Sequence, residues 1–315
     1  MNRNSSINVA FFGTSDRSIP VLDAIKNDPD LNLVLAITKS DVKVGRKQEL
    51  KETGVKKWSK ENKINFFTTS SLKYDKLRVV EQLLDSKVAL GIVTDFSFII
   101  QEEIINTPKY GIINIHFSLL PNWRGASPVQ FAILNGDQIT GITYHLVSKE
   151  MDRGDILFSI EYKIPDKPDS NQLNDSLFKI AAQNLPEIIK KYTRGDLVPK
   201  SQNESEATYT YSPTHPKSTF IYKEDAKINW RDSVDKIERT IRAFYPWPVA
   251  WTTLGELGQA LNITLREGKH LNLKVKVHTA EVTNLGGQSK LKINKLQVEG
   301  GKTMSWEEFI NGYSA

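Results

Sequence analysis

The chain has 315 residues, of which 39% are hydrophobic and 25% charged, a composition typical of a folded globular protein. Single hydrophobic cores stop growing near this length, so two domains are expected. The sequence has no cysteine, which excludes disulfide bridges and thiolate metal sites. The first residues lead into a short apolar strand instead of a signal-peptide core, and no apolar run reaches the roughly 20 residues that span a bilayer. We therefore expect a soluble, cytoplasmic protein that does not act at a membrane.

Positive charge is unevenly distributed along the chain. The net charge of +5 comes from 42 basic and 37 acidic residues. Residues 39–60 hold 8 basic and 3 acidic residues, and residues 209–315 hold 15 basic and 11 acidic residues. Either patch alone is equally well explained as a solvated surface, but two patches in separate regions favour a polyanionic partner such as nucleic acid.

The first 193 residues alternate strand-like and helix-like segments. Short, mostly apolar β-rich runs occur at Ile7–Phe12, Leu33–Thr38 and Val88–Thr94. Between them, residues with helical spacing occur at Val21–Lys26, Val55–Asn62 and Leu77–Leu84. This alternation predicts parallel βαβ units, and hence an α/β domain with a doubly wound, mostly parallel, Rossmann-like sheet.

Two further helices are expected before this domain ends. Ser127 as a cap, Pro128 at the first helical position and Gly136 at the exit predict a short helix. Leu173–Thr193 has the spacing of a longer helix that closes the domain, so residues 1–193 are predicted to form the first domain.

Residues 194–218 lose this periodicity and are rich in Ser, Pro and Gly, which predicts a linker. Val234–Ala243 follows as a short amphipathic helix behind Asp232 and Ser233. Segments with alternating β-type pattern come next, at Trp251–Leu254, Asn262–Arg266, Leu271–Val277 and Leu291–Val298. We therefore predict that residues 219–315 form a small, closed or partly closed, OB-like β-barrel, a kind of module often used on nucleic acids.

The densest group of chemically active side chains lies in residues 111–121. Asn114 and His116 alternate with apolar residues, so on a strand they project from the same face. A lone Asn-x-His is usually structural, but a Pro-terminated loop follows, and Asp152 and Asp155 come later as candidate carboxylates. In open α/β sheets, sites gather beyond the carboxyl ends of strands.

In order and spacing these residues resemble the folate-dependent formyltransferases. The matching motifs are Asn114-x-His116-x-Ser118-Leu119-Leu120-Pro121, Trp123-Arg124-Gly125, Pro128-Val129-Gln130, Gly141-Ile142-Thr143 and Asp152-x-Gly154. Within that family, the rest of the chain is similar to the members that act on methionyl-tRNA. That similarity lies in Phe11–Thr14, Thr38–Asp41, Gly45–Lys47, Asn229-Trp230, Ile241–Ala243 and Pro246–Ala250.

The resemblance implies an enzyme that transfers the formyl group of 10-formyltetrahydrofolate to the α-amino group of initiator methionyl-tRNA, for translation initiation. It implies that Asn114, His116 and Asp152 are the catalytic residues, with Asp152 preferred to Asp155 by its place in the motif. It places the folate site at two strand ends, Ser118, Leu119, Leu120 and Pro121 at one and Thr94, Asp95 and Phe96 at the other. It places tRNA contacts in the basic loop, at Lys43, Arg46 and Lys47.

The chemistry fits these residue types. An α-amino group has a reference pKa near 7.7–8.0, so a fair fraction is neutral at pH 7. The harder tasks are the negative charge on the formyl oxygen and the expulsion of a nitrogen leaving group. We expect Asn114 to donate to that oxygen and a protonated His116 to pass a proton to the departing nitrogen. We expect Asp152 to favour the charged imidazolium and to take the amine's proton.

Some segments depart from the family pattern and keep alternatives open. Thr94–Phe96 replaces a small turn, and Ser127 replaces an alanine. Tyr144–Val147 is closer to the formyltransferases of glycinamide ribonucleotide and of sugars, so a sugar-nucleotide or other small amine is the alternative acceptor. The basic loop and basic C-terminal part argue against it. A catalytically silent RNA-binding protein would have lost the Asn/His/Asp set, which this chain retains.

The other histidines have simpler explanations. His145 lies on a predicted strand, where a structural role with satisfied hydrogen bonds is expected, and His215, His270 and His278 lie in the linker or on the barrel surface. No pair has metal-ligand spacing, so no metal is expected. Gly13-Thr14-Ser15 lacks the later glycines of a dinucleotide fingerprint, which argues against a nicotinamide dehydrogenase. No exposed apolar stripe demands a partner, so a monomer is expected.

Overall fold

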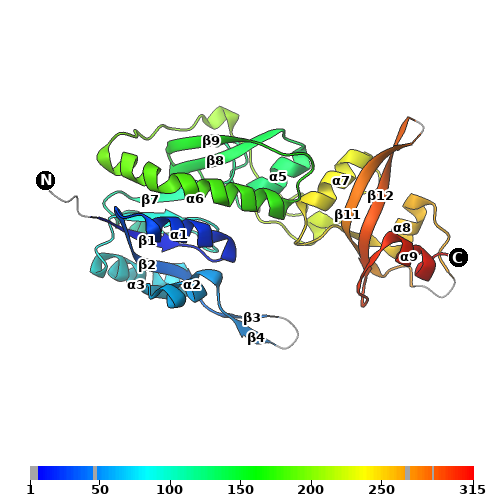
Figure 1. The fold of residues 1–315 in the computed structure, drawn as a ribbon, viewed down its shortest axis with the longest axis horizontal. Helices are drawn as coiled ribbons and strands as arrows, with labels where there is room; N and C mark the ends of the chain where they lie inside the picture. Colours follow the sequence, from blue (N-terminus) through cyan, green and yellow to red (C-terminus); the bar gives the residue numbers. More distant parts are fainter. Residues whose placement is uncertain (1–5, 45–47, 267–269, 286) are drawn as a thin grey trace. The chain divides into compact units, whose positions relative to one another are not determined.

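The computed structural model describes residues 6–44, 48–266, 270–285 and 287–315, and the chain forms two compact units (Figure 1). The first unit comprises residues up to 124 together with 140–162 and 174–208. The second comprises residues 125–139, 163–173 and 209–315. The chain therefore passes between the units several times, whereas the sequence pattern suggested two continuous domains joined by one linker.

The first unit is built on a seven-stranded sheet with the strand order β5-β2-β1-β6-β7-β8-β9. These strands are β1 (Ile7–Phe12), β2 (Leu31–Lys39), β5 (Phe66–Thr69), β6 (Leu90–Val93), β7 (Ile112–His116), β8 (Ile139–Leu146) and β9 (Ile156–Lys163). The pairs from β5 to β7 are parallel, and β7 pairs with β8 in the antiparallel sense. The predicted doubly wound, mostly parallel sheet is confirmed.

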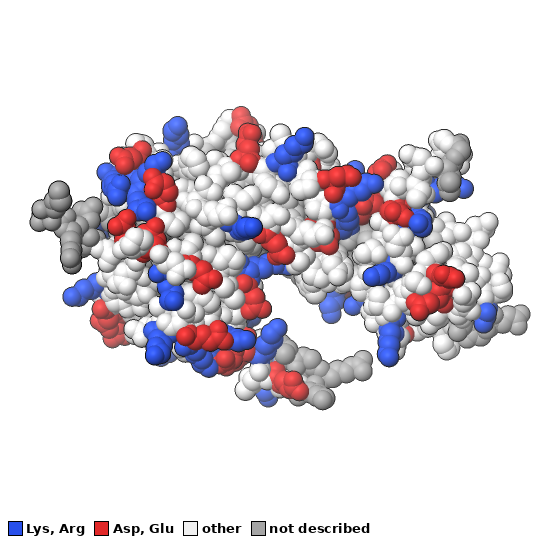
Figure 2. Space-filling model, viewed as in Figure 1, with Lys and Arg blue, Asp and Glu red and all other residues white. Residues whose placement is uncertain are grey.

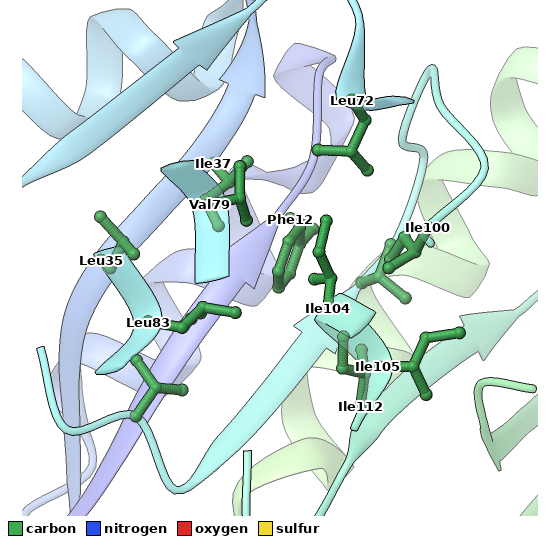
Figure 3. Packing of buried hydrophobic residues seen from close by; sticks show 13 residues of the cluster. Phe12, Leu35, Ile37, Leu72, Val79, Leu83, Ile100, Ile104, Ile105 and Ile112 are labelled. Carbon is green, nitrogen blue, oxygen red and sulfur yellow. The ribbon is translucent and has the colours of Figure 1, made fainter. Parts of the chain in front are cut away.

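Both faces of this sheet are covered, which explains the continuous apolar runs in its central strands. The helices of this part are α1 (Ile19–Asn27), α2 (Gly54–Asn62), α3 (Leu72–Asp85), α4 (Glu102–Ile105) and α6 (Ser170–Arg194). Phe12 and Ile37 point toward α3 and α4, where they pack against Val79 and Ile104 (Figure 3). Phe11, on the opposite face of β1, is equally buried.

The second unit has an antiparallel sheet in the order β10-β11-β12-β13. Its strands are β10 (Trp251–Thr253), β11 (Lys274–Leu285), β12 (Gln288–Val298) and β13 (Thr303–Ser305), and its helices are α5 (Pro128–Asn135), α7 (Val234–Ala243), α8 (Leu254–Leu261) and α9 (Trp306–Tyr313). Its core contains Ile241, Leu257, Val277 and Phe309. The sheet is antiparallel, as the alternating pattern predicted, and in the described residues it is open, with no pairing between its first and last strands.

A two-stranded hairpin and three short 3-10 helices complete the described structure. The hairpin is β3 (Val42–Val44) with β4 (Glu49–Lys51). The 3-10 helices are η1 (Asp16–Ser18), η2 (Glu204–Glu206) and η3 (Glu224–Ala226). Among the helices of the described ranges, none has both the length and the apolar character needed to cross a membrane.

Some predicted elements differ from the structure. Asn262–Arg266 is not a strand and contributes only a bridge from Leu265 to Ser314. The helix α8 precedes it, because Thr253 and Glu256 form a capping box that starts a helix. Gly136 ends α5 in the left-handed conformation, as predicted, but the Ser127 side chain makes no capping hydrogen bond.

Candidate active site

Two strands and one turn bring the candidate residues together in the first unit. β7 carries Asn114 and His116, and the antiparallel pairing places His145 of β8 directly opposite Asn114. Asp152 lies in the turn that follows β8. The four side chains of Asn114, His116, His145 and Asp152 are called the site cluster below.

The site cluster is closely spaced and largely buried. Asn114 Nδ2 lies 3.0 Å from His145 Nε2 and 3.2 Å from Asp152 Oδ1. His116 Nδ1 lies 3.7 Å from Asp152 Oδ2, and His145 Nε2 lies 3.6 Å from Asp152 Oδ1. The side chain of Asp152 is 10% exposed and that of His116 is 5% exposed. The sequence motif thus corresponds to one compact group of polar side chains.

The partners of His145 and Asn114 determine where their protons lie. His145 Nδ1 is 3.0 Å from the Leu146 carbonyl oxygen, which only accepts, so Nδ1 carries the proton and Nε2 has a lone pair. Asn114 Nδ2 therefore donates one hydrogen to His145 and the other to Asp152. A reversed Asn114 amide would turn its oxygen toward the lone pair of His145 and the carboxylate of Asp152, and both would repel it. Both N–H donors of Asn114 are thus engaged within the cluster.

The ring of His116 is held in the neutral form. Its Nε2 is 3.0 Å from the Trp123 carbonyl oxygen and donates to it, which leaves the Nδ1 lone pair facing Asp152. Burial lowers the pKa of His116 below its ordinary value of 6.5, and His145 and Arg124 act in the same direction. The Asp152 carboxylate raises this pKa but does not offset burial. The lowered pKa therefore favours a neutral resting ring, whereas the role expected for His116 in proton transfer uses its protonated form.

The turn that carries Asp152 has a defined backbone. Asp152 is left-handed, with φ +55°. A Cβ atom on Gly154 would lie 1.7 Å from the Leu146 carbonyl oxygen, so only glycine allows this turn to pack on the end of β8. Asp155, the competing carboxylate, accepts a hydrogen bond from Ser201 Oγ at 3.0 Å and lies outside the cluster.

The first group of predicted folate residues, Ser118–Pro121, forms a loop that is hydrogen-bonded to Thr143 of β8. Ser118 Oγ donates to the Asn122 carbonyl oxygen at 2.5 Å. Thr143 Oγ1 donates to the Ser118 carbonyl oxygen at 2.7 Å and accepts from Leu120 N at 3.1 Å. The loop Ser118–Pro121 therefore has a fixed course beside the site cluster, with Leu119 and Pro121 partly exposed.

The second group follows β6, at the same edge of the sheet as His116. Thr94 is buried, and Phe96 packs edge-to-face on Phe12 at a centroid distance of 5.7 Å. Asp95 is exposed, has φ +48° and accepts a hydrogen bond from Ser15 Oγ. Of these three predicted contacts, Asp95 is the side chain that is open to solvent.

Of the predicted tRNA residues, one is described by the structure and two fall outside the described residues. Lys43 is exposed on β3, opposite Leu50 of β4. Arg46 and Lys47 fall outside the described residues. Basic and acidic side chains are interspersed on the face shown in Figure 2. Nearby, Lys56 forms ion pairs with Asp41 at 2.7 Å and Glu52 at 3.1 Å, so part of the positive charge counted in residues 39–60 is neutralised locally.

In the part of the chain that the structure describes, no three carboxylate or imidazole side chains are arranged so that they could hold a metal ion.

The chain belongs to the formyl transferase family, whose model matches residues 7–189, and the model of the family's C-terminal domain matches residues 220–314. The chain is 33% identical over 313 residues to the methionyl-tRNA formyltransferase of Bacillus thuringiensis subsp. konkukian (strain 97-27), covering 97% of this chain and 96% of the relative. The methionyl-tRNA formyltransferase of Bacillus anthracis is equally similar, with 33% identity over the same length.

Solved structures share the fold at lower sequence identity. Methionyl-tRNA formyltransferase from Clostridium thermocellum aligns with a TM-score of 0.53 and 19% identity, over 91% of this chain and 98% of that one. HypX from Aquifex aeolicus, in complex with tetrahydrofolic acid, aligns with a TM-score of 0.60 and 15% identity, over 97% of this chain and 47% of that one. These matches support the two-part fold.

Sequence reasoning overlooked two contributors to this site. His145 was expected to have satisfied hydrogen bonds in a structural role; both of its ring nitrogens are hydrogen-bonded, and one of its partners is Asn114. Its spacing with Thr143, two residues apart on one strand, was the available signal. The carbonyl oxygen of Trp123, which fixes the His116 ring, carries no sequence signal because every residue has a carbonyl group.

Proposed function

We propose that this protein transfers the formyl group of 10-formyltetrahydrofolate to the α-amino group of initiator methionyl-tRNA. The observation that carries the proposal is the site cluster, in which the Asp152 carboxylate lies 3.2 Å from the Asn114 amide and 3.7 Å from the His116 imidazole, and the Asn114 amide lies 3.0 Å from His145. The near full-length similarity to two methionyl-tRNA formyltransferases supports the choice of acceptor.

The donor set fits a co-substrate that carries formyl on nitrogen. Transfer requires a bond from the amine nitrogen to the formyl carbon, cleavage of the bond from that carbon to the carrier nitrogen, and movement of one proton from amine to carrier. Asn114 supplies N–H groups for the developing negative charge on the formyl oxygen, and Asp152 and His116 supply proton acceptors. No other charge change is needed, because the proton lost by the amine is gained by the carrier.

A neutral resting His116 supports the following order of proton transfer. Asp152 accepts the amine's proton, and its oxygen then accepts less strongly from Asn114, so one amide N–H turns to the formyl oxygen. His116 Nδ1, 3.7 Å from Asp152, takes up the proton and passes it to the carrier nitrogen. The Trp123 carbonyl oxygen holds the ring in position throughout, because Nε2 keeps its hydrogen.

Each part of the chain has its own proposed role in this reaction. We propose that the sheet with the site cluster performs the chemistry and that Ser118–Pro121 and Asp95 border the folate. The C-terminal antiparallel sheet and the β3–β4 hairpin are assigned to the tRNA, with Lys43, Arg46 and Lys47 as phosphate contacts. The proposed setting is the cytoplasm, with the protein acting as a monomer, and sedimentation of the full chain tests the latter.

A formylation assay with several amine acceptors tests the proposal. The full chain is incubated with 10-formyltetrahydrofolate and one acceptor at a time: initiator methionyl-tRNA, elongator methionyl-tRNA, an amino-sugar nucleotide and glycinamide ribonucleotide. We expect formylation of the initiator methionyl-tRNA and strong loss of rate in His116→Ala with tRNA binding retained. Formylation of a small amine alone, with none of either tRNA, would replace the proposed acceptor by the alternative one.

A further inference from the structure

A segment far from the site cluster in sequence contacts both the loop that holds Trp123 and the turn that holds Asp152. Residues 200–208 follow the long helix α6 and belong to the first unit. Thr208 Oγ1 accepts a hydrogen bond from Trp123 N at 2.8 Å, and the Thr208 carbonyl oxygen accepts from Arg124 N at 2.9 Å. The same segment contacts the Asp152 turn through Gln202. The sequence pattern placed this segment in a linker, whereas the structure joins it to the candidate active site.

The Gln202 amide makes four hydrogen bonds at once. Its Nε2 donates to the carbonyl oxygens of Asp152 and Gly154, each at 2.8 Å. Its Oε1 accepts from Arg124 Nε at 3.1 Å and from Arg124 Nη2 at 2.7 Å. Both donors and both acceptor positions of the amide are therefore used. A reversed amide would set N–H groups against a guanidinium and an oxygen against two carbonyls, so the orientation is fixed.

Arg124 is in turn held by a carboxylate. Its side chain has 0% exposure, and its Nη1 and Nη2 donate to Glu204 Oε2 at 2.8 Å and Oε1 at 2.7 Å. This two-point pairing fixes the plane of the guanidinium as well as its position. A buried cation without such a partner is strongly destabilising, so the pair of Arg124 with Glu204 supports Gln202.

The two carbonyl groups that Gln202 binds flank Arg153, in the turn that sets the position of Asp152. Asp152 has φ +55°, a conformation that a non-glycine residue keeps only when its surroundings enforce it. Gln202 binds the carbonyl of that very residue. The Asp152 carboxylate must stay near two partners, Asn114 at 3.2 Å and His116 at 3.7 Å.

We propose that Gln202 is a positioning residue for Asp152, locked by Arg124 and Glu204. The inference rests on the proposed formyl transfer and assigns to residues 200–208 a role in that same site. Gln202 acts on the turn backbone and is assigned no contact with either substrate. Its loss is expected to lower the rate of the chemical step and to leave substrate binding largely unchanged.

The test compares Gln202→Glu with Asn203→Asp in the full chain. Gln202→Glu keeps the shape of the side chain and its pairing with Arg124 but removes both donors to the Asp152 turn. Asn203→Asp makes the same amide-to-acid change one residue later, where the side chain is exposed and bonds to Ser205 and Glu206. Gln202→Ala is made as well, so that the result does not depend on one variant, and thermal unfolding of each is recorded.

The measurements are kcat and KM for formylation of methionyl-tRNA. We expect Gln202→Glu and Gln202→Ala to lower kcat roughly 10- to 100-fold, the scale of a small misplacement of a reacting group, with KM for both substrates within about twofold. Asn203→Asp is expected to stay within about twofold in kcat. In an Asp152→Asn background, Gln202→Ala is expected to add less than about a twofold loss, because the carboxylate that the turn positions is already absent.

The outcomes separate this inference from the function on which it rests. If the wild type formylates methionyl-tRNA, and Gln202→Glu and Gln202→Ala are both as active as Asn203→Asp, the positioning role is overturned. The proposed function then remains intact. The positioning role is also overturned if the losses in kcat from Gln202→Ala and Asp152→Asn are fully additive in the double variant. It is overturned as well if the Gln202 variants change KM alone and leave kcat unchanged. A wild-type protein that formylates no amine overturns both.

Discussion

Asn114 of β7 donates a hydrogen bond to His145 of β8 from directly across an antiparallel strand pair, with 3.0 Å between Nδ2 and Nε2. His145 Nδ1 donates to the Leu146 carbonyl oxygen, which leaves Nε2 facing the amide. One Asn114 N–H is thereby held in place, and the other, shared with Asp152, is the group available for substrate.

The first prediction concerns this pair. His145→Ala frees the Asn114 amide to rotate, and we expect kcat to fall about tenfold. This factor corresponds to the upper end of the net free energy that one hydrogen bond contributes. His145→Gln restores an acceptor opposite the amide and is expected to stay within about threefold of wild type. Steady-state kinetics on methionyl-tRNA measure both. Equal losses in the two variants would show that the imidazole serves packing and not the orientation of the amide.

Several features of the fold follow from local patterns in the sequence. Ile7–Phe12 and Val234–Ala243 have the bounds expected of them, because the first is a continuous apolar run and the second combines 3.6-residue spacing with the Ser233 cap. The helix α8 was missed although Thr253-x-x-Glu256 is a legible capping box.

The site could be predicted only in part, for a physical reason. Asn114 and His116 share a face because strands have a period of two, which the sequence displays. His145 joins them through the register of β7 with β8, which depends on tertiary packing and has no local signature. Gln202 reaches the Asp152 turn from a segment without periodicity, so no pattern connects the two.

The second prediction concerns the amide at position 114. Asn114→Ala removes the N–H groups proposed for the formyl oxygen, and we expect kcat to fall about 10²- to 10³-fold, as for the loss of one oxyanion donor elsewhere. Asn114→Asp places a second carboxylate beside Asp152 and is expected to be at least as damaging. The assay is single-turnover formylation with saturating substrates. A rate for Asn114→Ala within about threefold of wild type contradicts the assigned role.

The third prediction concerns the titration of His116. Its pKa is lowered in the folded state, mainly by burial, so we expect the NMR signals of its ring to titrate with a midpoint below 6.5. The neutral ring is then favoured by folding, and this contribution to stability is fully present above pH 6.5. It is lost as the pH falls from 6.5 toward the folded-state pKa, because the unfolded chain binds the proton first.

Denaturant unfolding between pH 8 and pH 5 checks the sign of this effect. The wild type is compared with His116→Gln, so that the contribution of His278, whose pKa burial also lowers, cancels between the two proteins. We expect the wild type to lose more stability than His116→Gln as the pH falls. The reverse order would mean that the carboxylate of Asp152 outweighs burial and that His116 is charged at rest.

The fourth prediction concerns the glycine in the Asp152 turn. A Cβ at position 154 would lie 1.7 Å from the Leu146 carbonyl oxygen, so Gly154→Ala must displace the turn from the end of β8. Overpacking of this kind costs about 1–3 kcal/mol in unfolding free energy, and the shift of Asp152 adds a fall in kcat of roughly 10²-fold.

Gly312→Ala is the matched control, because no atom lies within 4 Å of its Cβ and the residue sits in α9. We expect that control to keep full activity and to gain about 0.5–1 kcal/mol, since alanine is the better helix former. Chemical denaturation and initial rates distinguish the two variants, and a Gly154→Ala protein as stable and active as Gly312→Ala would show that Asp152 tolerates a displaced turn.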